Sequence, residues 1–276
     1  MGTTLSRAQY IEVEGACLRA RSAGEGPAVV LVHGWALDLE MWRAQIDLLA
    51  DRYRVIAFDR RGFGRSSGVP GLEQDVQDID RLLDSFSISR AAIVGMSQGA
   101  RVALRWALQH PEQVSCLVLD GPPAEGWQQS VGAKEIPIDE YRQRIGVEGV
   151  DAFRSMWLQH PLMKLHTGSP CAHTLLREIV VRYPALDLLN EPPQLPLLSE
   201  RDLLRVDAPT LVLSGEHDSP QRRSIATRMA RALPDARLKV LRGAGHLGAL
   251  DDPNSYVQAL RDFFSSQPAM AAGAVM

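Results

Sequence analysis

Short apolar runs recur along the chain, and amphipathic segments separate them. Small and branched apolar residues fill successive positions in these runs, which is typical of strands buried on both faces of a parallel sheet. The intervening segments place apolar residues three and four positions apart, as a helix with one buried face does. We therefore predict buried strands at 28–32 and 91–94, and further strands at 54–58, 114–119, 210–213 and 236–241. Helices are predicted at 40–50, 73–86, 98–109, 221–233 and 253–264.

The beginning of the chain has a different pattern. Residues 10–14 and 16–21 alternate between apolar and polar side chains, which predicts an antiparallel hairpin at one edge of the sheet. Strands that alternate with helices form a mostly parallel sheet with helices on both faces. The sequence therefore predicts an α/β fold.

The stretch 122–206 interrupts this alternation. It has no strong buried strand, and several prolines divide it. It contains amphipathic pieces at 139–144, 150–158 and 174–182. A set of loops is one interpretation, but a structureless insertion of this length is unusual in a compact domain. We interpret 122–206 as a helical cap inserted between two strands, with 1–121 and 207–276 forming the core domain.

Composition narrows the range of partners and compartments. The 276 residues carry a formal net charge of −3, and the arginines are scattered, which argues against nucleic-acid binding as the main task. Cys17, Cys116 and Cys171 form no CxxC pair, so we expect reduced thiols and a cytoplasmic protein. No apolar segment is long enough to span a bilayer, so no membrane partner is expected.

The segment 95–99, Gly-Met-Ser-Gln-Gly, lies directly between a predicted buried strand and a predicted helix. This is the context of a nucleophile elbow, a sharp turn that presents a serine hydroxyl to the active site. Gly95 and Gly99 are small enough for such a turn, and Ser97 is the candidate nucleophile. A glycine-rich turn with a capping serine is the alternative interpretation. The flanking strand and helix favour the nucleophile.

A serine nucleophile needs a base and an acid that orients the base. Asp218 follows the strand 210–213, and His246 follows the strand 236–241 on a glycine-containing loop. The chain order serine, acid, histidine is the one expected on this type of fold. Asp120 also ends a predicted strand and is an alternative acid, although chain order favours Asp218. Glu216 and His217 are expected to have structural or supporting roles.

Two further loops follow predicted strands. Backbone N–H groups that stabilise an oxyanion are expected from Trp35, in the His-Gly-Trp loop 33–35, and from Gln98 at the start of a helix.

The segment 59–66, Asp-Arg-Arg-Gly-Phe-Gly-Arg-Ser, lacks the third glycine of a dinucleotide-binding fingerprint. We interpret it as a structural turn that supports the site loops. Binding of an anionic substrate through Arg60 or Arg61 is the less favoured alternative.

Together these motifs resemble the α/β-hydrolase superfamily, and the resemblance covers nearly the whole chain. The loop 33–35 and the turn 59–66 are similar to those of cofactor-free haloperoxidase/esterase and enol-lactonase relatives. The resemblance implies an eight-stranded sheet, a helical cap after the sixth strand, and acyl-enzyme chemistry without a cofactor. The chain departs from many such relatives after the serine, where it has Gln-Gly-Ala at 98–100.

The cap is expected to select the substrate. Trp127, Met156 and Trp157, together with Trp35, are the candidate substrate-binding residues, although such side chains also seat cap helices on the core. His160, His166 and His173 have no metal-ligand spacing, so no metal site is expected. The main hypothesis is hydrolysis of a small-molecule carboxylic ester or lactone. The alternatives are carbon–carbon bond hydrolysis, perhydrolysis as in the haloperoxidases, acyl transfer, and a non-enzymatic ligand receptor on the same fold.

Overall fold

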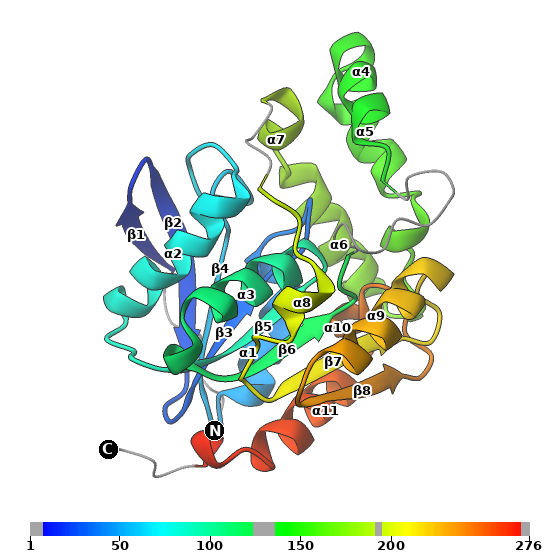
Figure 1. Cartoon of the computed structure of the whole chain (residues 1–276). Coiled ribbons are helices and arrows are strands. Elements are labelled where there is room, and N and C mark those ends of the chain that lie inside the picture. Colours follow the sequence, from blue (N-terminus) through cyan, green and yellow to red (C-terminus); the bar gives the residue numbers. More distant parts are fainter. Residues whose placement is uncertain (1–7, 124–135, 191–194, 272–276) are drawn as a thin grey trace.

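The computed structural model describes residues 8–123, 136–190 and 195–271. Within them, eight strands form one sheet in the order β1-β2-β4-β3-β5-β6-β7-β8 (Figure 1). The strands are β1 (Gln9–Val13), β2 (Ala16–Ala23), β3 (Ala28–Val32), β4 (Arg54–Phe58), β5 (Ala91–Met96), β6 (Val114–Asp120), β7 (Thr210–Gly215) and β8 (Ala236–Leu241). The first two form the predicted antiparallel hairpin at one edge, and β3 to β8 run parallel. The predicted α/β fold is confirmed.

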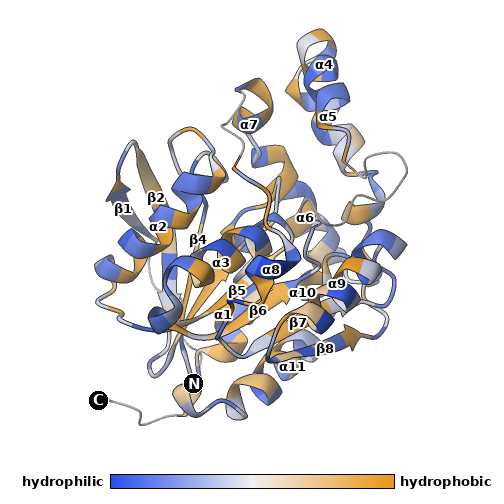
Figure 2. Ribbon diagram, in the orientation of Figure 1, coloured by the Kyte–Doolittle hydropathy of each residue, from blue (hydrophilic) through white to orange (hydrophobic). Residues whose placement is uncertain are grey.

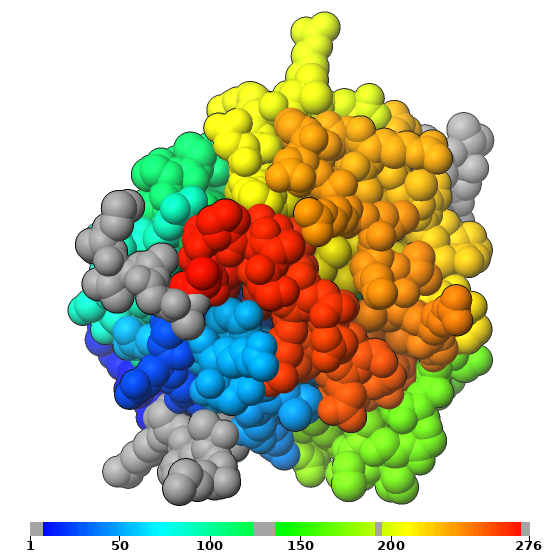
Figure 3. All heavy atoms as spheres, turned by 90° about the horizontal axis from the view of Figure 1, so that it is seen from below, coloured from blue at the N-terminus to red at the C-terminus, as the bar shows by residue number. Residues whose placement is uncertain are grey.

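Helices cover both faces of this sheet. They are α1 (Arg43–Leu49), α2 (Leu72–Ser85), α3 (Gln98–Gln109), α9 (Pro220–Ala232), α10 (Gly248–Asp251) and α11 (Pro253–Ser265). In the described ranges, single turns of 3-10 helix accompany them at η1 (Leu39–Trp42), η2 (Pro111–Gln113) and η5 (Pro268–Met270). Figure 3 shows α11 lying across one face of the molecule, between the segments of α1 and β8.

Successive residues of the central strands face opposite layers. Val29 and Leu31 of β3 pack into the apolar cluster that contains α1 and α11, whereas Val30 and Val32 pack into the cluster that contains α2, α3 and α9. Figure 2 shows the central strands as the most hydrophobic part of the ribbon. Burial on both faces explains why these strands have almost no polar residues before their carboxyl ends.

A group of helices is inserted between β6 and β7, as predicted for a cap after the sixth strand. They are α4 (Ile138–Glu148), α5 (Val150–Trp157), η4 (Pro161–Met163), α6 (Pro170–Arg182), α7 (Leu186–Leu189) and α8 (Glu200–Leu203). Figure 1 shows α4, α5 and α7 standing away from the sheet, on one side of the molecule. Leu203 and Val206 instead pack with the core beside α9. The division into a core and a cap at 122 and 206 stays a prediction.

The parallel register brings several carboxyl ends together at one edge. Val32 at the end of β3 lies opposite Gly95 of β5, and Met96 at the end of β5 lies opposite Asp120 of β6. Ligand sites of open α/β sheets form outside such an edge. The loops that carry the candidate residues all leave the sheet there.

Candidate active site

Ser97 lies in a sharp turn between β5 and α3. Its backbone has φ 51° and ψ −118°, a conformation that costs energy for a residue with a Cβ. A Cβ on Gly95 would lie 2.3 Å from the carbonyl oxygen of Gly99, and a Cβ on Gly99 would lie 2.3 Å from that of Val32. Only glycine fits at both positions. The backbone N–H of Ser97 donates to the Asp120 carbonyl at 2.7 Å, which holds the strained turn against β6.

His246 and Asp218 meet beyond the ends of β8 and β7. The distance from His246 Nδ1 to Asp218 Oδ2 is 2.9 Å, and both side chains are buried. Asp218 Oδ1 also accepts the backbone N–H of Ser219 at 2.7 Å, so the carboxylate is held on both oxygens. Ser97 and His246 line the same pocket. The structure therefore brings the His246–Asp218 pair to the pocket of Ser97, which lies more than a hundred positions earlier in the chain.

Asp120, the alternative acid, has a different partner. Its Oδ2 accepts a hydrogen bond from the Tyr256 hydroxyl at 3.1 Å, in a fully buried site. Burial raises the pKa of the Asp120 carboxyl to about 7, the Tyr256 hydrogen bond lowers it, and the nearby Asp218 carboxylate raises it. Because His246 bonds Asp218 while Asp120 bonds Tyr256, the geometry favours Asp218 as the orienting acid.

The raised pKa of Asp120 predicts a pH dependence of stability. Its folded pKa of about 7 lies above the ordinary value of 3.8, so the folded state binds more protons than the unfolded state between these values. The stabilisation that the protonated Asp120 contributes should therefore be lost as the pH rises from 4 through 7, and Asp120→Asn should lack this part of the pH dependence, while the contributions of Asp59 and Asp75 remain in both proteins. Between pH 5 and pH 8 the variant should gain roughly 3 kcal/mol relative to the wild type in urea unfolding. Parallel stability curves for the two proteins would contradict the assignment.

The loop after β3 lies directly against the nucleophile turn. A Cβ on Gly34 would lie 2.6 Å from Met96 Sδ and 3.3 Å from Ser97 Cβ. The buried His33 ring holds the loop, because its Nε2 accepts the Arg60 backbone N–H at 2.9 Å and its Nδ1 bonds the Gly34 carbonyl at 2.8 Å. A backbone N–H only donates, so the proton of the ring is on Nδ1. Burial, helped by the Arg60 charge, holds the pKa of His33 well below its usual value and keeps the ring neutral.

The Trp35 side chain connects this loop to the inserted helices. Its indole N–H donates to Asp187 Oδ2 at 2.5 Å, and the Tyr183 hydroxyl donates to the other oxygen of that carboxylate. Its ring also packs on four aromatic rings, with centroid distances of 4.7 to 6.3 Å, from Tyr141, Phe153, Trp157 and Tyr183. The sequence analysis did not single out Asp187, because nothing local marks a carboxylate that bonds a residue 152 positions away.

A small pocket of about 260 Å³ opens above Ser97. Apart from Ser97 and His246, its described lining is apolar: Trp35, Leu37, Met96, Ile136, Trp157, Leu162, Met163 and Leu247. Two of the predicted substrate-binding residues, Trp35 and Trp157, are in this lining. Met156 is not, since it packs half-buried against the core with Arg144 near its sulfur. Trp127 lies outside the described residues.

The arginine-rich turn after β4 is tied into the protein interior. Arg60 is buried, donates to Asp75 at 2.8 Å and to the Gln98 side-chain oxygen at 2.5 Å, and lies over the Phe63 ring. Arg61 forms a two-point ion pair with the Asp78 carboxylate. Burial raises the pKa of Asp75 to about 6, although Arg60 opposes this shift. These pairings agree with a structural turn, and they show that the Gln98 side chain is held by Arg60.

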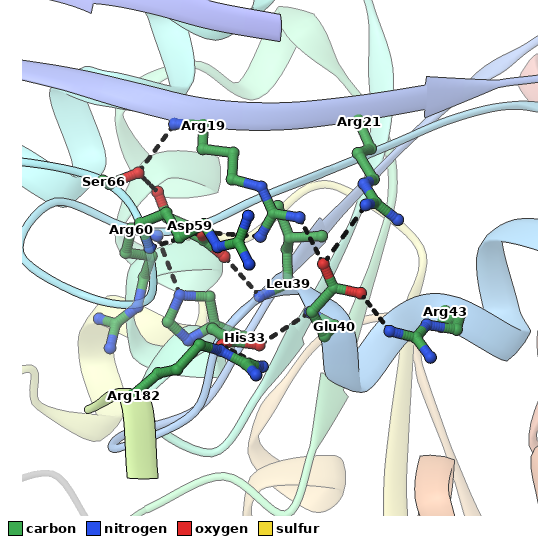
Figure 4. A network of polar contacts seen from close by, with 12 residues as sticks. Arg19, Arg21, His33, Leu39, Glu40, Arg43, Asp59, Arg60, Ser66 and Arg182 are labelled. Carbon is green, nitrogen blue, oxygen red and sulfur yellow. Dashed lines mark hydrogen bonds and ion pairs between the residues drawn. The ribbon is translucent and has the colours of Figure 1, made fainter. Parts of the chain in front are cut away.

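The Asp59 carboxylate joins this turn to the loop after Trp35. It accepts the backbone N–H of Leu39 at 2.7 Å and that of Arg65 at 2.9 Å, within the polar network of Figure 4. Burial and the nearby Asp38 raise the pKa of Asp59 to about 6. Arg182 of α6 donates to Asp38 at 2.9 Å, so the network also reaches the inserted helices.

Metal clusters and membrane-spanning helices are both absent from the described part of the chain. Across 8–123, 136–190 and 195–271, no group of three or more His, Cys, Asp or Glu side chains is arranged to hold a metal ion. In the same ranges, no helix combines the length and the apolar character needed to cross a membrane.

A strained serine between a buried strand and a helix, with a His–Asp pair on neighbouring strand ends, is the arrangement of a serine hydrolase on an α/β sheet. The comparison with known families agrees. The chain belongs to the alpha/beta hydrolase fold family, whose sequence model matches residues 27–193. The predicted α/β-hydrolase is therefore confirmed as a hydrolase of this superfamily.

Several relatives resemble almost the whole chain. A pimeloyl-(acyl-carrier protein) methyl ester esterase of Photobacterium profundum is 29% identical over 88% of this chain and 96% of its own length. The solved esterase of Thermogutta terrifontis is 27% identical, with a TM-score of 0.78 over 94% of this chain and 98% of that one. The enol-lactonase of Burkholderia xenovorans LB400 shares the fold, at 23% identity and a TM-score of 0.75 over 94% of this chain and all of that one.

Proposed function

We propose that this protein hydrolyses a small-molecule carboxylic ester or lactone through an acyl-enzyme on Ser97. The observation that carries the proposal is the buried His246–Asp218 hydrogen bond of 2.9 Å, on the pocket that Ser97 also lines. Asp218 holds the proton of His246 on Nδ1, which leaves Nε2 free to accept the proton of a serine hydroxyl. The likeness to esterases over nearly the whole chain supports the same reaction class.

In the proposed reaction, Ser97 Oγ attacks the ester carbonyl carbon while His246 Nε2 takes the hydroxyl proton. The tetrahedral intermediate collapses when the alcohol leaves with that proton. Water then attacks the acyl carbon while His246 takes its proton, and the acid is released as the bond to Ser97 Oγ breaks and His246 returns the proton to that oxygen. Asp218 stays ionised throughout and stabilises the imidazolium.

The oxyanion of the intermediate needs two hydrogen-bond donors. The backbone N–H of Gln98 opens α3, where the first-turn N–H groups have no partner within the helix and the helix dipole favours negative charge. The backbone N–H of Trp35 is the proposed second donor, supported by the close approach of Gly34 to Ser97. Loss of one such donor typically costs ~10²–10³-fold in rate.

The pocket supports a short, apolar acyl group. Apart from Ser97 and His246 its described walls are apolar, and they include no lysine or arginine that could pair with a carboxylate. We propose that the segment 122–206 forms a cap over this acyl group, with Trp157 at its inner surface and Trp127 as a further candidate from the sequence. A cytoplasmic location belongs to the same proposal, since Cys17, Cys116 and Cys171 are all free thiols.

A panel of p-nitrophenyl esters tests the proposal. The wild type should hydrolyse the acetate and butyrate with a higher kcat/KM than the decanoate, because Trp157, Leu162 and Met163 of the inserted helices enclose the space beside Ser97. A fluorophosphonate probe should label the native protein on the peptide that contains Ser97, as mapped by mass spectrometry, and heat-denatured protein should stay unlabelled. Absence of both turnover and labelling would refute an acyl-enzyme mechanism.

A further inference from the structure

Asp251 lies at the end of α10, five positions after His246, and is buried. Its Oδ2 accepts the backbone N–H of Gly245 at 2.7 Å. Its Oδ1 accepts the backbone N–H of His166 at 2.6 Å and that of Thr167 at 3.2 Å. One carboxylate therefore holds two separate segments: the loop that carries His246, and the inserted chain between η4 and α6.

Close packing surrounds these hydrogen bonds. A Cβ on Gly245 would lie 2.5 Å from His166 Cδ2 on one side, and a Cβ on Gly215 would lie 2.0 Å from the Gly245 carbonyl oxygen on the other. The His166 ring stacks on the His217 ring, with 4.8 Å between their centroids. Gly245 is thus enclosed between the end of β7 and the inserted segment. Its backbone N–H, directly before His246, is held by the Asp251 carboxylate.

We propose that Asp251 is a positioning residue that couples the inserted segment to the catalytic base, a proposal that rests on the proposed function. The carboxylate sets the position of Gly245, and Gly245 sets the direction in which the chain presents His246 to Ser97. The same carboxylate also holds the backbone of residues 166 and 167 by hydrogen bonds. These residues follow the pocket-lining residues of η4. A displacement of the inserted segment therefore moves the His246 loop.

The chemistry of the site requires two acceptor oxygens. Three backbone N–H groups converge on the carboxylate from two directions, and within the described residues Asp251 forms no ion pair. In Asp251→Asn, one oxygen is replaced by an NH₂ group, which donates and does not accept. The amide then faces at least one N–H donor, so either the His246 loop or the inserted segment loses its anchor.

The test compares kcat per active site. Asp251→Asn should lower kcat for p-nitrophenyl butyrate by roughly 10- to 100-fold, because small misplacements of a catalytic group have effects of this size. The KM should change by less than about threefold, since the apolar walls keep their side chains. Fluorophosphonate titration counts the competent sites, so that loss of folded protein does not count as loss of kcat.

Asp252→Asn is the matched control. Asp252 is the next residue, and its carboxylate caps α11 by accepting the Ser255 N–H at 3.0 Å. The same chemical change there should lower thermal stability and leave kcat per site at the wild-type value. Asp251→Glu keeps both acceptor oxygens at a different reach, so the expected order of kcat is Asp, then Glu, then Asn. If Asp251→Asn does not fold, the kcat per site of Asp251→Glu is compared with that of Asp252→Asn instead.

A second readout does not depend on turnover. The proton in the His246–Asp218 hydrogen bond should give a low-field NMR signal, assigned by its loss in Asp218→Asn. This signal should shift or broaden in Asp251→Asn and stay unchanged in Asp252→Asn. If Asp251→Asn leaves the signal unchanged and keeps a kcat per site above half the wild-type value, the positioning role is overturned. If the wild type is inactive but the signal still shifts in Asp251→Asn, only the proposed function is overturned.

Discussion

Ser97→Ala should reduce ester hydrolysis by about 10⁵- to 10⁶-fold, close to the limit of detection in a p-nitrophenyl assay. The methyl group cannot form the acyl-enzyme, so the pocket and the oxyanion donors alone remain to assist water. The fold should tolerate the change. The substituted alanine would inherit the same positive φ and the same backbone N–H bond to Asp120, so the thermal midpoint should stay within a few degrees of the wild type.

Ser87→Ala is the matched control for this variant. Ser87 also has a positive φ, of 53°, and lies in the turn that follows α2. It undergoes the same chemical change in a similar backbone conformation, and wild-type kcat/KM is expected. Retention of more than one per cent of the activity by Ser97→Ala, in protein free of wild-type carry-over, would mean that another residue is the nucleophile.

The strands could be predicted from the sequence because burial on both faces leaves a continuous apolar signal. The bounds of β3 and β4 are those of the apolar runs. The bounds of β8 were also predicted, but this edge strand contains Arg237 and Lys239 and is largely exposed. The predicted ends of β5, β6 and β7 fall one or two residues short, since these strands continue to Met96, Asp120 and Gly215. Glycine and polar residues at those ends suggest a turn, but here they stay in the sheet because the site is built on the last residues of its strands.

The candidate triad could be proposed from chain order, whereas its supporting residues could not. Ser97, Asp218 and His246 each follow a recognisable strand, and the order of the three types is specific. Asp187 and Asp251 carry no comparable local signal. An aspartate in a short helix resembles an ordinary capping residue, and its function here depends on contacts with residues 152 and 85 positions away. Such pairings follow from the three-dimensional packing and not from periodicity.

Asp218→Asn should lower kcat by about 10⁴-fold while the fold persists. The amide can offer its NH₂ group to His246 Nδ1, which favours the ring tautomer with the proton on Nε2, and that tautomer cannot accept the serine proton. The Ser219 N–H bond to the side-chain oxygen can be kept, so the loop should hold its place. The measurement is kcat for p-nitrophenyl butyrate, normalised to folded protein by circular dichroism.

Asp120→Asn separates the two candidate acids. The side-chain carbonyl of the new amide can still accept the Tyr256 hydroxyl, and no hydrogen bond joins Asp120 to His246 among the described residues, so kcat should stay within about threefold of the wild type at pH 7.5. If Asp120→Asn instead loses most of its kcat while Asp218→Asn keeps the wild-type kcat, Asp120 is the orienting acid. Comparable losses in both would point to a shared role, because the negative charge on Asp218 already contributes to the raised pKa of Asp120. A double variant then measures the coupling: if Asp218 acts alone, adding Asp120→Asn to Asp218→Asn should cause no further loss of kcat.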